Sequence, residues 1–156
     1  MDHSNEVSKV AMYETQGCWV ILVQQELTRE SAQEFQRNVL DKIHLKSVKG
    51  VVIDLSGINV IDSQLWSVFS KTAQMIKIMG VPSVITGLSP GVVASIIDHD
   101  LNINEVATAL NLEEALSILN QSDELAPEDD IQDNEENDLL EDTSENDLNN
   151  DEFIRD

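Results

Sequence analysis

Basic residues are scarce in this chain of 156 residues: nine Lys and Arg stand against 30 Asp and Glu, for a formal charge of −21. Binding to nucleic acid or to an anionic membrane surface needs clustered basic side chains, so this balance argues against both. The only cysteine, Cys18, cannot form an internal disulfide. No apolar run approaches the ~20 residues of a membrane span, and the polar, acidic start does not resemble a signal peptide. We therefore expect a cytoplasmic protein.

Motifs for catalysis and cofactor binding are also missing. The sequence has no Gly-x-Ser-x-Gly elbow, no Walker-type loop and no Gly-x-Gly-x-x-Gly fingerprint. Its three histidines are too scattered to suggest a metal centre. His99 with Asp98 and Asp100 could be a proton-transfer group, but a histidine at a helix end is the more ordinary interpretation. Cys18 is expected in the core, because nothing near it in sequence would lower its pKa. We expect no enzyme activity, no cofactor and no metal.

The charge divides the chain into two parts. Residues 1–120 hold 14 acids and 8 bases (8 − 14 = −6), whereas residues 121–156 hold 16 acids and 1 base (1 − 16 = −15). A segment with so much charge and only eight apolar residues cannot bury enough surface to offset its chain entropy. The sequence therefore predicts a folded domain over residues 1–120 and a disordered acidic tail over residues 121–156.

Hydrophobic periodicity and turn residues predict the elements of the first part. A β-hairpin is expected from Val7–Tyr13 and Cys18–Gln24, joined by a short loop that contains Gly17. The remaining elements, in order, are a helix over 29–45, a buried strand over 51–55, a helix over 63–79, a strand over 82–86, a helix from Pro90 to Asp98, a strand over 105–109 and a helix that ends near Asn120. Such alternation indicates an α/β fold with a mixed, mostly parallel sheet flanked by helices.

The apolar spacing of two helices predicts their inward faces. In the first, Ala32, Phe35, Val39 and Ile43 recur at helical spacing. In the second, the expected inward stripe consists of Leu65, Val68, Phe69, Thr72, Ile76 and Met79.

The loop from Asp54 to Ser63 is the most informative part of the sequence. Asp62 suits the N-cap of the second helix, where its carboxylate can accept from the amides of the first turn. Ser63 would then occupy the first helical position, with its hydroxyl accessible to a kinase and beside the positive end of the helix. On the residues alone, two interpretations stay open: a well-capped helix without further function, and a phosphorylation site.

The pattern Asp54-Leu55-Ser56, followed by Asp62-Ser63, resembles the signature of the STAS domain, the family of sulphate-transporter and anti-sigma-factor-antagonist domains. In that family a strand ends in Asp-Leu-Ser/Thr and an Asp-Ser pair opens the next helix. The similarity extends over about residues 8–120. Residues 79–90 and 105–114, together with the short N-terminus, resemble the RsbS-type stressosome branch.

The resemblance implies a non-enzymatic scaffold that regulates a bacterial stress response. Such a protein assembles into the stressosome, a large particle, with sensory paralogues of the RsbR type. It holds a serine/threonine kinase of the RsbT type, releases the kinase when phosphorylated, and is reset by a phosphatase. Carried over by position, the phosphoacceptor is Ser63, preceded by Asp62. Thr86 is a weaker second candidate, for which a strand-end threonine bonded to the backbone is the ordinary interpretation.

Two features depart from the family pattern. Trp66 replaces a small or aliphatic residue, and we expect it either to contact a partner or to lie on the sheet. The acidic tail, which the short branch generally lacks, puts the transfer of assembly behaviour in doubt. The alternatives are a stand-alone anti-sigma-factor antagonist that binds an anti-sigma kinase as a small soluble partner, and a small enzyme on the same sheet.

Overall fold

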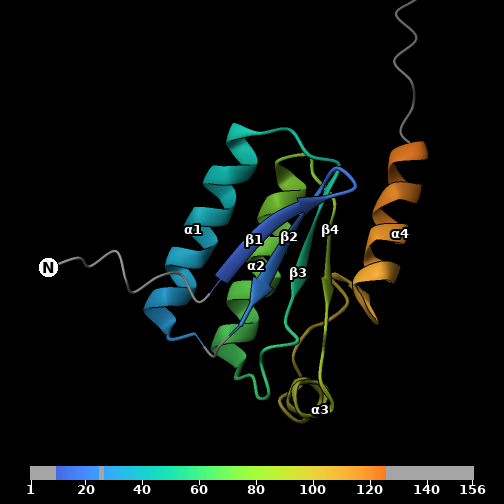
Figure 1. Cartoon of the computed structure of the whole chain (residues 1–156). Coiled ribbons are helices and arrows are strands. Elements are labelled where there is room, and N and C mark those ends of the chain that lie inside the picture. Colours follow the sequence, from blue (N-terminus) through green and yellow to red (C-terminus); the bar gives the residue numbers. More distant parts are fainter. Residues whose placement is uncertain (1–9, 25–26, 126–156) are drawn as a thin grey trace, which may run out of the picture. The chain divides into compact units, whose positions relative to one another are not determined.

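A five-stranded sheet forms the centre of the protein in the computed structural model, which describes residues 10–24 and 27–125. The strands lie in the order β1-β2-β3-β4-β5, with β1 antiparallel to β2 and all other neighbours parallel (Figure 1). The α/β class, the element order and the mostly parallel sheet predicted from the sequence are confirmed. The elements are β1 (Val10–Thr15), β2 (Cys18–Val23), α1 (Arg29–Leu45), β3 (Gly50–Asp54), α2 (Ser63–Ile78), β4 (Ser83–Thr86), α3 (Pro90–Asp98), β5 (Ala107–Ala109) and α4 (Leu112–Glu124).

The hairpin of β1 and β2 closes with only two residues, a shorter loop than the sequence predicted. Thr15 pairs directly with Cys18, and Gln16 and Gly17 have φ values of 52° and 78°. Two consecutive positive φ angles define the type I′ turn, whose twist matches that of the paired strands. The predicted start of the first strand, residues 7–9, lies outside the described residues.

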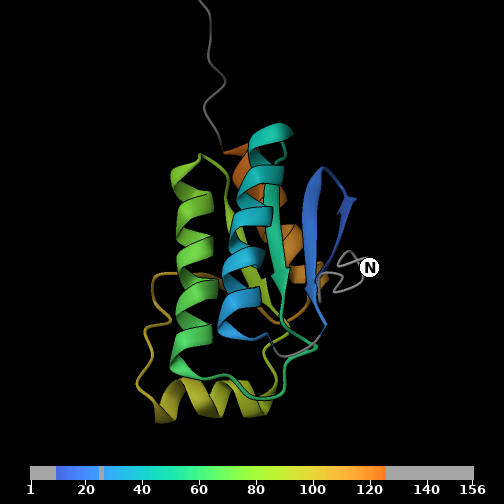
Figure 2. The same ribbon diagram turned by 90° about the vertical axis from the view of Figure 1, so that its left-hand side faces the viewer.

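Helices α1 and α2 cover one face of the sheet, and α4 covers part of the other (Figures 1 and 2). The predicted inward face of α1 is confirmed, since all four of its apolar residues are buried. Phe35 of α1 and Phe69 of α2 pack edge to face with ring centroids 5.5 Å apart. On the opposite face, Leu119 of α4 lies directly over Gly50, where an added Cβ atom would come within 2.7 Å of its side chain.

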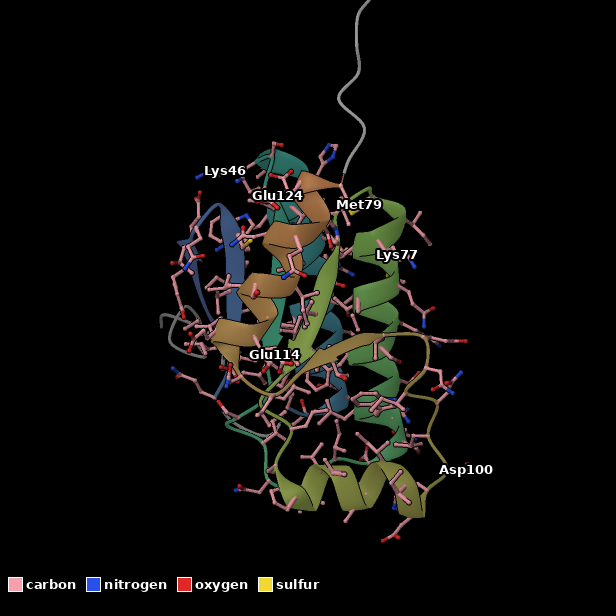
Figure 3. All side chains as sticks on the ribbon, turned by 90° about the vertical axis from the view of Figure 1, so that its right-hand side faces the viewer. Lys46, Lys77, Met79, Asp100, Glu114 and Glu124 are labelled. Carbon is pink, nitrogen blue, oxygen red and sulfur yellow. The ribbon has the colours of Figure 1, made fainter. Side chains whose placement is uncertain are left out.

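The inward stripe of α2 differs from the predicted one at its end. Met79 is 41% exposed, so its assignment to the core was wrong. The reason is that α2 ends at Ile78, and Met79 is its C-cap, beyond the edge of the packed layer (Figure 3). Val68 is only partly buried, while Ser70 and Ala73 join the buried face.

The last helix continues past the predicted boundary at residue 120, because α4 runs to Glu124. The folded domain therefore includes the first residues of the segment 121–156, and Lys49 pairs with Asp123 at 3.3 Å. The disorder predicted for the rest of that segment lies outside the described residues. In the described part of the chain, no helix combines the length and the apolar character needed to cross a membrane.

Candidate functional site around Ser63

The parallel strands β3 and β4 end at the same edge of the sheet, where α2 begins and α3 lies across it (Figures 1 and 2). Residues 55–62 connect β3 to α2 at this edge. Two buried side chains, Ile58 and Ile61, anchor this loop in the core. These buried side chains therefore fix the position of the loop that leads into α2.

Asp62 caps α2 as the sequence predicted. Its Oδ1 accepts a hydrogen bond of 2.7 Å from the N–H of Leu65, and its carbonyl oxygen accepts one of 3.0 Å from the N–H of Trp66. Ser63 is the first helical residue and is exposed. The hydroxyl of Ser63 thus stands at the N-terminus of a capped, 16-residue helix, where the amides and the helix dipole favour an anion.

A second turn, at the end of β3, fixes the other side of the loop. Oδ1 of Asp54 accepts from the N–H of Ser56 at 2.9 Å, and the N–H of Leu55 donates to the carbonyl oxygen of Thr86 at 2.9 Å. Gly87 has a φ of 75° and packs so closely that a Cβ atom there would lie 2.4 Å from Oδ1 of Asp54. Only glycine fits this combination of conformation and contact.

The start of α3 contacts the same loop. Ser89 caps this helix, its Oγ accepting from the N–H of Val92 at 3.3 Å. The carbonyl oxygen of Asn59 lies so near the backbone of Gly91 that an added Cβ atom would be 2.6 Å away. The loop before Ser63 is therefore held from β3, β4 and α3 together.

Thr86, the second candidate for phosphorylation, is 1% exposed. Its Oγ1 makes no hydrogen bond within the described part of the chain, so the expected bond to the backbone is not present either. A kinase cannot reach this hydroxyl without opening the sheet. The burial argues against Thr86 as a phosphoacceptor.

Trp66 is 3% exposed, and its indole Nε1 donates to the carbonyl oxygen of Asn102 at 3.2 Å. A side chain with so little exposed surface cannot be a direct partner contact in the folded domain. The burial therefore argues against the partner-contact interpretation. The indole anchors the chain after α3 to the first turn of α2.

Two features near Ser63 were not found from the sequence. Val60, Val93 and Ile97 are 60%, 44% and 70% exposed and place apolar surface on the loop and on α3. In addition, Nε of Arg29 donates to Oε1 of Gln64 at 3.2 Å, which brings a cation from the start of α1 to the residue after Ser63. The contact between Arg29 and Gln64 joins residues 35 positions apart, so local periodicity could not indicate it.

The other polar groups singled out by the sequence do not form a second site. Cys18 is fully buried in β2, and burial raises the pKa of its thiol, opposed by the charge of Lys49. His99 is the exposed C-cap of α3. Within residues 10–24 and 27–125, His, Cys, Asp and Glu side chains do not gather in threes as a metal centre would require.

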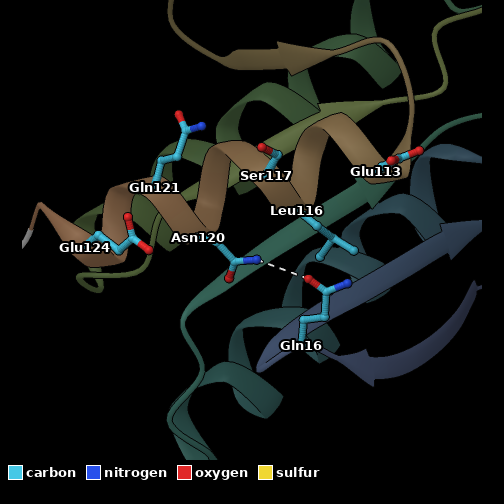
Figure 4. A pocket seen from close by; sticks show the side chains of 7 residues that line it. All are labelled: Gln16, Glu113, Leu116, Ser117, Asn120, Gln121 and Glu124. Carbon is cyan, nitrogen blue, oxygen red and sulfur yellow. Dashed lines mark hydrogen bonds between the residues drawn. The ribbon is translucent and has the colours of Figure 1, made fainter.

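A shallow pocket of about 340 Å³ lies between the hairpin turn and α4 (Figure 4). Its walls hold amide, hydroxyl and acidic groups, and Nδ2 of Asn120 donates to Oε1 of Gln16 across it at 3.1 Å. It lies at the end of the sheet where the parallel strands begin, opposite Ser63. The pocket is thus separate from the candidate site.

Comparison with known proteins identifies the family. The model of the STAS domain matches residues 9–115. This match covers most of the chain and includes every residue of the site described above, so the protein belongs to the STAS domain family. The sequence-based recognition of a STAS domain is confirmed.

The chain is similar to three proteins whose names refer to RsbS, to an RsbT co-antagonist or to the stressosome. The RsbT co-antagonist protein RsbRD of Bacillus subtilis is 23% identical over 104 residues, which are 67% of this chain and 37% of the relative. A serine-to-glutamate variant of RsbS from Moorella thermoacetica is 29% identical, with a TM-score of 0.66, over 76% of this chain and 100% of the other. A structure from work on the molecular architecture of the stressosome is 28% identical, with a TM-score of 0.62, over 74% of this chain and 100% of the other. These relatives support a scaffold or antagonist role.

Proposed function

We propose that this protein is a non-enzymatic scaffold of a stressosome in the cytoplasm. It binds a serine/threonine kinase of the RsbT type, together with sensory paralogues of the RsbR type, and releases the kinase when Ser63 is phosphorylated. A phosphatase removes the phosphate and resets the complex. The likeness to RsbS and to a stressosome structure supports the assembly.

The observation that carries the proposal is the position of Ser63. Its side chain is exposed at the first residue of α2, next to the capping carboxylate of Asp62, and the loop before it is fixed by three elements. A kinase needs an accessible hydroxyl in a defined backbone conformation, and Ser63 meets both conditions. Thr86 fails the first, because it is buried.

Phosphorylation is expected to act on the partner and not on the fold. A phosphate adds about −1.5 to −2 charges at neutral pH. At a helix N-terminus an anion is favoured by roughly 0.3–1 kcal/mol, so α2 should not melt. A kinase surface that accepts a neutral hydroxyl beside Asp62 would instead have to desolvate a dianion. If this differential reaches about 2.7 kcal/mol, the affinity falls about a hundredfold.

The apolar surface of Val60, Val93 and Ile97 suits the kinase contact. These side chains are exposed on the same loop and on the helix that supports it. Apolar contact area would supply affinity, whereas the charge at Ser63 would control it. In this arrangement the apolar surface holds the kinase, and a phosphate on Ser63 is sufficient to release it.

The experiment is phosphorylation of the purified full chain by the cognate RsbT-type kinase and ATP, with the modified residue located by mass spectrometry. Phosphate on Ser63 is expected. Ser63→Ala should fold normally, keep the kinase bound and abolish its release. Ser63→Asp should weaken binding less than phosphate does, because it carries one charge on a shorter side chain. Modification elsewhere with Ser63 untouched would overturn the assignment.

Size-exclusion chromatography separates the scaffold from a stand-alone antagonist. The protein is run alone and with its sensory paralogue. A large particle in the mixture supports the scaffold. If only small complexes with the kinase form, the protein is an antagonist that acts as a soluble partner.

A further inference from the structure

A cation lies beside the candidate phosphorylation site. Arg29 is the first residue of α1, and its Nε donates to Oε1 of Gln64, the residue after Ser63, at 3.2 Å. Arg29 and Gln64 are 35 positions apart in the sequence. They meet because α1 and α2 lie side by side with their N-termini at the same end of the domain (Figure 2). The packing of these two helices therefore brings a guanidinium group to the start of α2.

The first turn of a helix is an unusual place for a cation. The N-terminus is the positive end of the helix dipole, where acidic side chains are favoured and basic ones are not. Helix α4 follows this rule, with Glu113 and Glu114 in its first turn. Helix α1 begins instead with Arg29, and Glu30 follows it. A side chain that breaks a local rule without a gain inside its own helix indicates a role in another contact.

The hydrogen bond to Gln64 is one that a stronger acceptor can replace. Arg29 and Gln64 are both exposed, so water competes with their bond. The acceptor is a neutral amide oxygen, and it engages Nε, only one of the several N–H donors of a guanidinium group. The planar fork of these donors matches two oxygens of a phosphate, which adds charge to the hydrogen bonds. An anion close to Gln64 would therefore attract the guanidinium group away from it.

A phosphate on Ser63 needs a cation to offset its charge. The carboxylate of Asp62, the preceding residue, accepts from the N–H of Leu65 and would repel the phosphate. Along α2 the first basic side chain is Lys71, more than two turns after Ser63. The helix dipole favours the anion, and hydrogen bonds from a guanidinium group to a phosphate are about twice as strong as those between neutral groups. Arg29 is the basic side chain whose position suits this phosphate.

We propose that Arg29 binds the phosphate on Ser63: after phosphorylation its guanidinium group leaves Oε1 of Gln64 and donates to the phosphate oxygens. The inference rests on the phosphorylation of Ser63 proposed above and assigns the phosphate a receptor in the same domain. Helix α2 and its cap stay in place, because only the side chain of Arg29 turns. The phosphate is then held between the starts of α1 and α2, where the charge of Arg29 offsets the repulsion from Asp62.

The first test uses the full chain with phosphoserine introduced at position 63 during synthesis, so that no kinase is needed. Phosphorus NMR measures the second pKa of the phosphate, ordinarily about 6, in this chain and in its Arg29→Ala and Arg37→Ala variants. Arg37 is an exposed arginine about two turns further along α1 and serves as the matched control. A bound cation favours the dianion, so the pKa should be about 0.5 higher in Arg29→Ala than in the other two chains. Equal pKa values in all three would overturn the proposal.

The second test observes the guanidinium group directly. The Nε–H signals of Arg29 and Arg37 are recorded by proton–nitrogen NMR at low temperature, in the full chain with serine and with phosphoserine at position 63. The Arg29 signal should shift on phosphorylation, because its acceptor changes from the amide oxygen of Gln64 to a phosphate oxygen. The Arg37 signal should stay where it is. An Arg29 signal that does not respond would contradict the exchange of acceptors.

The two proposals can fail separately, and kinase binding to the same phosphorylated chain distinguishes them. If phosphoserine at position 63 releases the kinase while the pKa of the phosphate is the same with and without Arg29, the switch at Ser63 stands and the role of Arg29 is refuted. If Arg29 lowers this pKa but the kinase binds the phosphorylated chain as tightly as the unmodified one, the contact of Arg29 stands. The function proposed for Ser63 is then refuted.

Discussion

Gly87 lies against the carboxylate of Asp54: a Cβ atom at position 87 would be 2.4 Å from Oδ1 and 2.6 Å from the N–H nitrogen of Ser56. The φ of Gly87 is 75°. The end of β4 and the turn after β3 therefore fix each other, and this turn leads into the loop before Ser63.

Gly87→Ala should lower the free energy of unfolding by about 2 kcal/mol or more, because a positive φ and a steric overlap act together. Gly80→Ala is the matched control. Gly80 has a φ of 88°, but an added Cβ atom meets nothing within 4 Å. Chemical denaturation measures both variants. Equal losses would show that the contact with Asp54 adds nothing.

Replacement of the α2 cap should distinguish its hydrogen bond from its charge. Asp62→Ala removes the acceptor for the N–H of Leu65 and should cost about 1 kcal/mol of stability. Asp62→Asn keeps an acceptor oxygen and should cost much less. Thermal unfolding compares the two. A large loss in Asp62→Asn would mean that charge at the helix N-terminus contributes more than the hydrogen bond.

Trp66→Phe tests whether the indole is an internal residue. It removes the hydrogen bond to the carbonyl oxygen of Asn102 and leaves a small cavity, which together should cost about 1–3 kcal/mol. Kinase affinity, measured on the folded protein, should change little. Unchanged stability with weakened kinase binding would restore the partner-contact interpretation.

The thiol of Cys18 should make the protein less stable at alkaline pH. Burial raises the pKa of this thiol in the folded state. Above the pKa of the unfolded chain, the unfolded state loses the proton while the folded state keeps it, so stability falls as pH rises. Denaturant titrations at neutral and alkaline pH should show a smaller fall for Cys18→Ala, and the native thiol should resist alkylation. An equal fall in both proteins would contradict this account.

Truncation should locate the end of the folded domain. Removal of residues 126–156 deletes 14 acids and one base and should leave the melting temperature unchanged or slightly higher, since like-charge repulsion is relieved. A chain cut after Asn120 should melt lower, because it loses the last turn of α4 and the Lys49–Asp123 pair. A marked fall in melting temperature for the longer chain would show that residues 126–156 contribute to the fold.

Local signals in the sequence were sufficient for most of the fold. The cap Asp62 was predicted from its residue type, and it accepts the expected bond from the first turn of α2. Thr28 and Ser89, also residues typical of helix caps, accept the corresponding bonds in α1 and α3. The element order followed from periodicity. These features depend on contacts within a few residues, and such contacts are encoded directly by neighbouring side chains.

The C-terminal end of α4 was not recognisable, because Gln121–Glu124 carry the same polar composition as the residues that follow. In the structure, the pairing of Asp123 with Lys49 and the bond between Asn120 and Gln16 tie this helix to the hairpin side of the domain. These contacts join residues that are distant in sequence, so local composition could not indicate them.

The sequence by itself determined where the candidate site lies in the fold: Asp62 and Ser63 stand at the start of a helix after a buried strand, in a domain of STAS type. Only the tertiary structure decided which neighbouring groups are accessible. Thr86 and Trp66 are polar or amphipathic, and nothing in their local sequence shows that the sheet and the segment after α3 bury them. Burial depends on elements that are distant in sequence, so the exposed surface around Ser63 emerges only when the chain is folded.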